Sequence, residues 1–346
     1  MAGAASDSPL LPAALARLAA GEQLGRETAR RLGDAMMNGS ATDAQVGALL
    51  ALWHTRGETV EELIGLTLSM RAHAVPVDLP PGAVDTCGTG GDGAGSFNIS
   101  TAAALVVAGA GCPVAKHGNR AATSRAGSAD VLEALGVRVV LPPEGVAACV
   151  AASGMGFMFA PAFHPAARHV AGPRGELGIR TAFNLLGPMA NPAGVQFQVI
   201  GTGDLGTAGR IAAVLAELGT VHALVVVGPD GLDELGLSGP SVGHEVQHGS
   251  VRELVVDPVE LGLEPAPLSA LAGGDAAANA AIITQVLAGE PGPPRDVVLL
   301  NSAAALVAAN RVPTLAAGLA AARASLSTGK AQGVLARLVA ASNRAG

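Results

Sequence analysis

Aromatic side chains are scarce in this chain of 346 residues, which has no tyrosine, one tryptophan and six phenylalanines. Because 49% of its residues are hydrophobic, a sizeable core can still form, built mainly from Ala, Val and Leu. Charged residues make up only 14% of the chain, and its formal net charge is −7. The chain therefore lacks the basic footprint with which proteins bind nucleic acid or an anionic membrane, and we expect neither partner.

Cysteine is equally rare, with Cys87, Cys112 and Cys149 alone. An odd number of cysteines without metal-ligand spacing indicates reduced thiols in a cytoplasmic protein. The first ten residues contain no basic segment of the kind that opens a signal peptide. The longest apolar stretch, residues 101–115, is too short to span a bilayer and is broken by two glycines and a proline. The sequence predicts a soluble, cytoplasmic protein.

The N-terminal part of the chain reads as helical after a small, polar tail at residues 1–8, which we expect to be disordered. Thr42 and Gln45 have the spacing of a capping box before an apolar helical face, and Thr59 and Glu62 repeat it. A Pro-rich linker follows. We therefore predict a helical domain over residues 9–79 and an α/β domain over residues 80–346.

From Val84 onward, short apolar runs typical of strands alternate with helical segments. Strands that alternate with helices predict a mostly parallel sheet covered by helices on both faces, with a less regular, antiparallel piece up to Val256. The fold class is α/β, with a small N-terminal helical domain beside this larger domain. The expected strands are 112–115, 137–141, 157–159, 197–202 and 222–227, and the expected helices include 143–153, 206–218, 276–287, 297–309 and 314–322.

A glycine-rich stretch, residues 85–101, lies between the apolar runs 83–84 and 101–110 and predicts a strand, a loop and a helix. Glycines allow the backbone to approach a ligand, and the N–H groups at a helix start form an anion site. The segment Lys116–Arg120 follows the next apolar run. Two such loops on neighbouring parallel strands would face one crevice, which predicts a polyphosphorylated ligand.

Two common phosphate motifs do not account for this stretch. Gly88, Gly90 and Gly93 satisfy the G-x-G-x-x-G dinucleotide pattern, but the next strand ends in Lys116, where that fold needs a carboxylate for the ribose. The stretch contains no G-x-x-x-x-G-K followed by Ser or Thr, so a P-loop is not expected either.

Seven motifs follow one another in the chain: 88–92, 96–101, 116–120, 127–130, 174–181, 183–188 and 230–235. Together they resemble the anthranilate phosphoribosyltransferase family, over nearly the whole chain from about Leu10. The resemblance implies transfer of the phosphoribosyl group of phosphoribosyl pyrophosphate (PRPP) to the amine of anthranilate, the second step of tryptophan biosynthesis. It also implies a homodimer formed through the helical domain, and a return segment around residues 168–192 that belongs to that domain.

Such a transfer needs anion cradles and cations more than a nucleophilic side chain, because pyrophosphate leaves and the aromatic amine is already neutral. No catalytic nucleophile or base is therefore expected. The resemblance implies that PRPP is bound by Gly88, Gly91, Asp92, Ser96, Asn98, Ile99, Ser100, Thr101, Lys116, His117, Gly118, Asn119, Arg120, Ala121, Ala122, Thr123, Ser124 and Ser128. For Ser128, a simple helix N-cap is a compatible second role.

Asp233 and Glu234 are adjacent carboxylates after the turn at Asp230. Adjacent residues share a face in neither a helix nor a strand, so both can reach one cation only from a loop. Carboxylate oxygens suit Mg²⁺, which also bridges to substrate phosphates. Spacing alone favours an exposed acidic turn. The resemblance implies that this pair and Ser100 hold Mg²⁺.

Anthranilate carries a carboxylate beside its amine, and a planar guanidinium binds a carboxylate through two hydrogen bonds. Arg174 matches the family's anthranilate-binding arginine, with Gly88 and Asn119 beside it. Arg180 is a rival that the sequence alone does not separate from it. His117 and His164 fit either the acceptor path or a structural role. Ala167 stands where the family often has a larger residue, which leaves acceptor selectivity open.

Two other functions compete with this one. A pyrimidine-nucleoside phosphorylase shares the architecture but uses inorganic phosphate and needs no carboxylate-held metal. A related nucleic-acid-binding protein would have a basic surface and a broken glycine loop. The Asp233–Glu234 pair, the intact loop and the acidic composition favour the transferase.

Overall fold

The computed structural model describes residues 10–121 and 125–345, so the predicted tail at 1–8 lies outside the described residues. The chain forms two compact units. One comprises the chain up to Val75 together with Phe163–Ala190, and the other comprises Pro76–Ala162 with the chain from Asn191 onward. The sequence predicts the boundary between the two domains after residue 79, and the structure places it after Val75. The return segment is expected at about residues 168–192, and it comprises Phe163–Ala190.

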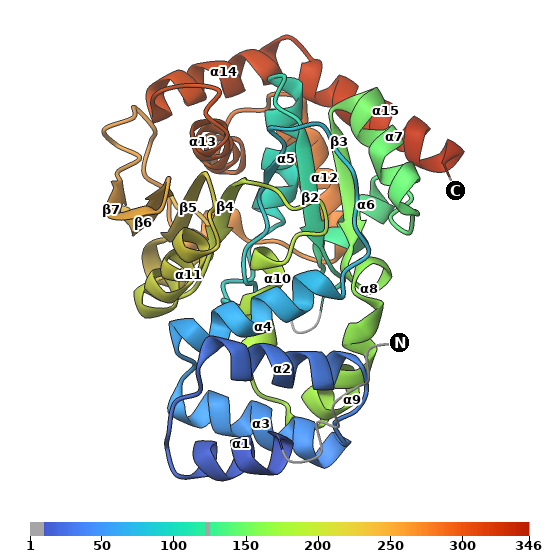
Figure 1. The fold of residues 1–346 in the computed structure, drawn as a ribbon. Helices are drawn as coiled ribbons and strands as arrows, with labels where there is room; N and C mark the ends of the chain where they lie inside the picture. The colour runs from blue at the N-terminus through green and yellow to red at the C-terminus, as the bar shows by residue number, and fades with distance from the viewer. Residues whose placement is uncertain (1–9, 122–124, 346) are drawn as a thin grey trace. The chain divides into compact units, whose positions relative to one another are not determined.

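The smaller unit is helical (Figure 1). Both predicted capping boxes are confirmed: Thr42 accepts a hydrogen bond from the backbone N–H of Gln45, and Thr59 accepts one from that of Glu62. The return segment contributes two further helices, so the unit is completed by residues distant in the sequence. Its elements are α1 (Leu10–Ala19), α2 (Arg26–Met37), α3 (Asp43–Arg56), α4 (Val60–Ala72), the end of α8 (Ala160–Phe163), the 3-10 turn η1 (Pro165–Ala167), α9 (Arg168–Leu177) and α10 (Ala182–Met189).

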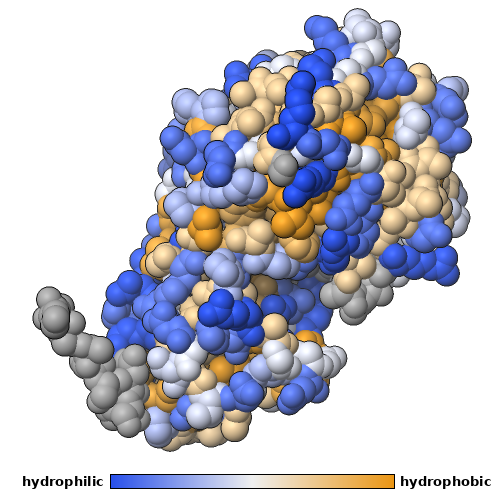
Figure 2. Space-filling view, turned by 90° about the vertical axis from the view of Figure 1, so that its right-hand side faces the viewer, coloured by the Kyte–Doolittle hydropathy of each residue, from blue (hydrophilic) through white to orange (hydrophobic). Residues whose placement is uncertain are grey.

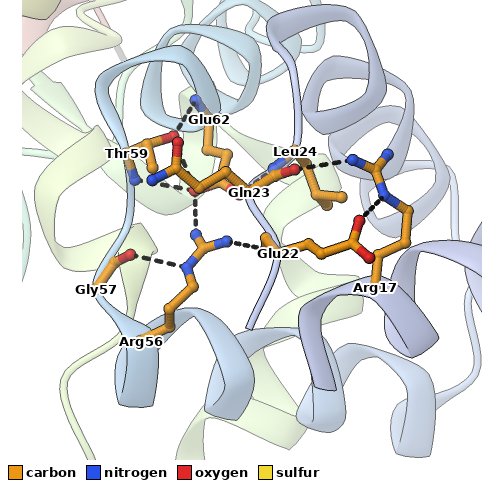
Figure 3. Close-up of polar contacts among 8 residues, drawn as sticks. All are labelled: Arg17, Glu22, Gln23, Leu24, Arg56, Gly57, Thr59 and Glu62. Atoms are coloured by element: carbon orange, nitrogen blue, oxygen red, sulfur yellow. Dashed lines mark hydrogen bonds and ion pairs between the residues drawn. The ribbon is translucent and has the colours of Figure 1, made fainter. Parts of the chain in front are cut away.

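Glu62 has a second role beyond its capping box, because its fully buried carboxylate links three segments of the helical unit (Figure 3). Its Oε1 accepts a hydrogen bond from the backbone N–H of Leu24 at 2.9 Å, and its Oε2 accepts from Thr59 and from the Arg56 guanidinium. Burial acts to raise the pKa of Glu62, but these hydrogen bonds outweigh it and the pKa is lowered. The ionised carboxylate therefore stabilises this unit.

The larger unit is built on a seven-stranded sheet in the order β3-β2-β1-β4-β5-β6-β7. The pairs among β1 to β5 are parallel, whereas β6 and β7 are antiparallel additions, so the predicted mostly parallel sheet is confirmed. Every residue of β2 and β5 is buried, which means that both faces of the sheet are covered there. The strands are β1 (Val84–Asp85), β2 (Val114–Gly118), β3 (Met155–Phe159), β4 (Phe197–Gly201), β5 (His222–Val227), β6 (Ser241–Gln247) and β7 (Ser250–Val256).

Small aliphatic side chains form the core of this unit, as the composition predicts. In α5 every residue except Ser100 is buried, and the helix contains no aromatic residue. The cysteines at 87, 112 and 149 are free thiols. The helices and 3-10 turns are α5 (Ile99–Gly109), α6 (Ser128–Ala134), α7 (Pro143–Ser153), α11 (Leu205–Glu217), η2 (Pro229–Gly231), η3 (Leu268–Leu271), α12 (Ala276–Leu287), α13 (Pro293–Ala308), α14 (Leu315–Ser327) and α15 (Lys330–Arg344).

The strand expected at residues 137–141 is wrong. Val137, Val139 and Leu141 are buried in the alternating manner of a strand, but the segment joins no sheet. Instead the backbone N–H of Arg138 donates to the Ser342 hydroxyl of α15 at 3.0 Å. One backbone N–H of this segment is therefore bonded to a helix near the end of the chain and not to a neighbouring strand.

None of the helices in residues 10–121 and 125–345 is long and apolar enough to cross a membrane. On the face of the larger unit drawn in Figure 2, apolar residues reach the surface between hydrophilic ones. This mixed surface agrees with a composition rich in hydrophobic and poor in charged residues.

Candidate active site

The predicted phosphate-binding segments meet at the carboxyl ends of the parallel strands of the larger unit, where α/β sheets commonly bind ligands. The glycine loop, residues 86–98, follows β1 and lies against the end of β4. The backbone N–H of Thr89 donates to the Gly201 carbonyl at 2.8 Å. A Cβ atom at Gly88 would lie 3.0 Å from that same oxygen, so the close approach favours glycine.

Four glycines give this loop its shape. Gly90, Gly91, Gly93 and Gly95 have φ angles of +65°, +71°, +73° and +65°, a region that other residues rarely adopt. Asp92 fixes the turn between them, since its carboxylate accepts a hydrogen bond from the backbone N–H of Ala94 at 3.0 Å. These φ angles and this hydrogen bond give the glycine loop a folded, defined conformation.

Lys116 lies inside the site, with only 2% of its surface exposed. Its ammonium contacts the carbonyl and hydroxyl oxygens of Thr86 at 3.3 and 3.2 Å, and the hydroxyl of Ser100 at 3.3 Å. The structure thus brings Lys116 and Ser100 together, from β2 and from the first turn of α5. A positive charge is held between the start of the glycine loop and a helix N-terminus, which favours an anion beside it.

Asp233 and Glu234 follow β5 in a loop, as the metal hypothesis requires. The Glu234 carboxylate accepts a hydrogen bond from the backbone N–H of Ser100 at 3.1 Å, and the backbone N–H of Asp233 donates to Asp92 at 3.3 Å. Burial, and after it the charge of Asp233, raise the pKa of Glu234. Both residues are half-buried, so the alternative of an exposed acidic turn is wrong.

This donor set fits a hard cation, which would relieve the repulsion between the two carboxylates. Among the described residues, no three His, Cys, Asp or Glu side chains group as metal ligands, at this site or at any other. Two carboxylates and a hydroxyl do not complete a coordination shell, so a Mg²⁺ held here would need water or substrate oxygens as well.

Arg120 is expected to direct its charge toward PRPP, but in the structure it is paired with other side chains. Its guanidinium forms ion pairs with Asp130 at 3.0 Å and Glu133 at 2.6 Å, and lies 5.5 Å from the ring centroid of Phe159. Its charge is therefore balanced within the chain. The motif spacing gave no sign of this pairing, because Glu133 lies outside the motif and one helical segment further on.

Ser128 is not a helix N-cap. The N-cap of α6 is Gly127, whose N–H donates to Asp130, while the Ser128 hydroxyl donates to the Asn119 carbonyl at 3.3 Å. Gly118 allows this packing, because a Cβ atom there would overlap the Ser128 hydroxyl. Ser128 thereby fixes the end of the second loop, which follows β2 and whose described residues are 119–121 and 125–127.

Asp85, at the end of β1, is a functional candidate that the sequence analysis missed. Its fully buried carboxylate accepts hydrogen bonds from the His117 N–H at 3.2 Å and from the Asn191 amide at 2.7 Å. Burial raises the pKa of Asp85 to about 6, and the Lys116 ammonium opposes that rise. Because Asn191 is far away in the sequence, no local pattern could reveal the pair.

A second missed group is residues 271–279, which run from the last residue of η3 into the first turn of α12. The Gly273 N–H donates to the Gly95 carbonyl at 2.8 Å, and the Phe97 N–H donates to the Leu271 carbonyl at 3.0 Å. The second half of the glycine loop is therefore paired with a distant segment. The only local signal is a Gly-Gly-Asp turn before a helix, which says nothing of its partner.

The candidate acceptor residues Arg174, Arg180 and His164 belong to the helical unit. The Arg174 guanidinium in α9 lies 5.4 Å from the ring centroid of Phe183 in α10, and burial lowers its pKa. Arg180 is exposed between the two helices. Burial lowers the pKa of His164 to about 4, which leaves a neutral imidazole and favours a structural role.

The remaining predicted donor residues that the structure describes lie in the same loops of the larger unit. Ser96 and Asn98 belong to the paired half of the glycine loop, Ile99 and Thr101 to the first turn of α5, and Ala121 to the second loop, where its N–H donates to Asp130. Ala122, Thr123 and Ser124 lie outside the described residues.

Known proteins match both units of this chain. Residues 80–332 match the glycosyl transferase family, a/b domain, and residues 12–74 match the glycosyl transferase family, helical bundle domain. Anthranilate phosphoribosyltransferase from Bradyrhizobium sp. (strain BTAi1) is 52% identical over 333 residues, which are 96% of this chain and 99% of that protein.

Two solved structures extend this similarity to the fold. Anthranilate phosphoribosyltransferase (TrpD) from Thermus thermophilus is 44% identical, with a TM-score of 0.90 over 95% of this chain and 99% of that one. The Saccharomyces cerevisiae enzyme in complex with PRPP and Mg is 27% identical, with a TM-score of 0.87 over 98% of this chain and 99% of that one. The chain therefore belongs to the anthranilate phosphoribosyltransferase family.

Proposed function

We propose that the glycine loop, Lys116, Ser100 and the Asp233–Glu234 pair bind the PRPP donor in this enzyme. The reaction transfers the phosphoribosyl group of PRPP to the amine of anthranilate and gives N-(5-phosphoribosyl)anthranilate and pyrophosphate, the second step of tryptophan biosynthesis. The observation that carries the assignment of the site is the meeting of a glycine loop, a buried ammonium and a carboxylate pair at one edge of the sheet.

The chain's own groups stabilise charge on the leaving pyrophosphate. Lys116 provides a fixed positive charge, and the N-terminus of α5 adds backbone N–H groups and the favourable end of a helix dipole. The positive-φ glycines let the backbone itself approach the ligand. Because the anthranilate amine is neutral and already nucleophilic, these residues work mainly by positioning and electrostatics.

We assign the Mg²⁺ ligands to Ser100, Asp233 and Glu234. When bound, Mg²⁺ would neutralise part of the pyrophosphate charge in the donor. The raised pKa of Glu234 and the position of Ser100 against its carboxylate support this assignment. The solved Saccharomyces cerevisiae structure in complex with PRPP and Mg is consistent with it.

We assign anthranilate binding to Arg174, with Gly88 and Asn119. A guanidinium held over an aromatic ring is pre-organised to donate two hydrogen bonds to a planar carboxylate. The family also supports a homodimer formed through the helical unit and a cytoplasmic location for this biosynthetic enzyme. Light scattering coupled to gel filtration tests the dimer, which a purely monomeric mass at micromolar concentration would contradict.

The decisive experiment follows the fall in anthranilate fluorescence when protein, PRPP and Mg²⁺ are mixed, with each omitted in turn. A decay that needs all three supports the full assignment. A decay without Mg²⁺, after treatment with a chelator, would contradict the metal assignment alone. Cleavage of a pyrimidine nucleoside by inorganic phosphate, with no anthranilate consumed, would favour the phosphorylase instead.

A further inference from the structure

The second half of the glycine loop is held by residues 271–274, a segment far from it in the sequence. Ser96 and Ala272 form an isolated antiparallel bridge, and backbone hydrogen bonds join Gly95 to Gly273 and Phe97 to Leu271. A Cβ atom at Gly273 would lie 2.8 Å from the backbone of Phe97. The two segments therefore pack at backbone distance.

Asn279, in the first turns of α12, completes this contact. Its side chain is 2% exposed. The amide oxygen accepts a hydrogen bond from the Gly274 N–H at 2.7 Å, and the amide nitrogen donates to the Asn98 side-chain oxygen at 2.9 Å. One buried side chain thus fixes the turn before α12 and an asparagine of the donor loop at the same time.

Asn98 in turn connects the glycine loop to the second loop. Its amide nitrogen donates to the Ala126 carbonyl at 3.2 Å, two residues before Ser128. Asn98 is the N-cap residue of α5, a position where asparagine usually caps its own helix, yet its side chain makes no such bond. Both ends of the amide are used to bridge Asn279 and the second loop, and each bond fixes the orientation that the other needs.

We propose that Asn279 is a positioning residue for PRPP binding, which acts by orienting Asn98 so that the glycine loop and the second loop keep a fixed spacing. This inference rests on the proposed function of the two loops as the donor site. Asn279 itself lies behind the loop and donates to Asn98, so it acts through that residue.

The test compares Asn279→Ala and Asn279→Asp with the wild-type enzyme. Alanine removes both hydrogen bonds. Aspartate keeps an acceptor for Gly274 but turns an oxygen toward the Asn98 oxygen, so the loops lose their connection while the side-chain volume is retained. We expect each variant to raise the KM for PRPP about tenfold and to leave the KM for anthranilate within about twofold.

Ser325→Ala is the matched control for a simple loss of stability. The Ser325 hydroxyl is buried and donates to the Val106 carbonyl at 2.8 Å, at the opposite end of α5. Its removal should lower the melting temperature as the Asn279 variants do, without changing the KM for PRPP. An unchanged KM for PRPP in both Asn279 variants would overturn the proposal.

Hydrogen–deuterium exchange of the substrate-free protein separates this inference from the proposed function. Peptides covering residues 94–100 and 125–128 should both exchange faster in the Asn279 variants than in Ser325→Ala. If neither loop changes, Asn279 does not hold them and the proposal fails, whatever the activity. If both loops loosen but PRPP binding is unaffected, the positioning role fails too. Absence of transferase activity in the wild type would contradict the proposed function, not the coupling of the loops.

Discussion

The backbone carbonyl oxygen of Asp233 occupies the space in which a Cβ atom on Gly201 would have to lie. The end of β4 and the carboxylate loop are therefore in direct backbone contact. We predict that Gly201→Ala displaces this loop and lowers kcat/KM by about 100-fold, because small misplacements of binding groups have large effects on rate. Steady-state kinetics with a Mg²⁺ titration measures this loss, and the Mg²⁺ concentration needed for half-maximal activity should rise.

Gly203→Ala is the matched control for this variant. Position 203 is two residues further on, and among the described residues the nearest atom to a Cβ there would be the Gly231 carbonyl oxygen at 3.5 Å, an ordinary contact. This variant should keep nearly wild-type kinetics. Equal losses in the two variants would mean that the contact between Gly201 and Asp233 has no special role.

Removal of the carboxylate pair tests the metal assignment directly. In the double variant Asp233→Ala and Glu234→Ala, turnover should fall by about 10² to 10³, since the charge-stabilising groups at the leaving group are lost. The fold should persist, because the pair lies in a loop and ionised Glu234 is disfavoured by its burial. Circular dichroism and Mg²⁺-dependent rates are the measurements, and normal Mg²⁺-dependent rates would contradict the assignment.

The control for the double variant is Asp230→Asn. It removes a third carboxylate from the same loop and keeps a residue that tolerates the positive φ of +59° found at this position. If loss of negative charge in the loop were sufficient to abolish turnover, this variant would be impaired as well. We expect it to retain most of its activity.

Local signals in the sequence account for the features that were predicted correctly. The Thr42 and Thr59 capping boxes depend on residues three apart, and the strands 197–201 and 222–227 on runs of neighbouring apolar residues. The position of the glycine loop at the end of β1 follows for the same reason. Each of these features reflects covalent geometry and short-range hydrogen bonding, which a sequence displays directly.

Long-range contacts account for what was missed. Asp85 accepts a hydrogen bond from Asn191, and Asn98 accepts one from Asn279. The partners lie far apart in the sequence, so no local periodicity indicates either pair. Arg120 is balanced by Glu133 only because α6 folds back beside it. Buried and exposed residues do alternate at 137–141, but the backbone N–H of Arg138 bonds to Ser342 of α15 and the segment joins no sheet. Whether a side chain faces a ligand or another side chain depends on these tertiary contacts.

The choice between Arg174 and Arg180, which the sequence left open, leads to a further prediction. Arg174 is held over Phe183, whereas Arg180 is exposed in the connection between α9 and α10. Loss of a charge-assisted hydrogen bond to a carboxylate weakens binding by about 10- to 100-fold. We therefore expect Arg174→Ala to raise the KM for anthranilate by that factor, with the KM for PRPP little changed.

Arg180→Ala serves as the comparison, and it should leave the KM for anthranilate within about twofold of wild type. For Phe183→Leu, the KM for anthranilate should lie between those of the two arginine variants, since this change keeps the guanidinium but removes the ring that holds it. The reverse order of effects, with Arg180→Ala the more damaging, would transfer the acceptor assignment to Arg180.

The pH dependence of stability in the helical unit follows from Glu62. Its pKa is lowered in the folded protein, so its contribution is fully present above the unfolded value, about 4.3, and is lost as the pH falls through the folded pKa. Glu62→Gln should destabilise the protein by about 2 to 3 kcal/mol at pH 7, because it removes the charge that Arg56 and two backbone N–H groups share.

Urea unfolding of wild type and Glu62→Gln at pH 7 and at pH 3 measures this difference, which should shrink markedly at the lower pH as the wild-type carboxylate becomes protonated. Glu61→Gln is the matched control on the same turn of α4. Its carboxylate pairs with Arg26 at the surface, with a side chain 53% exposed, so it should change stability by less than about 1 kcal/mol. A Glu62→Gln effect that stays constant between the two pH values would mean that side-chain packing, rather than the ionised carboxylate, stabilises the junction of α3 and α4.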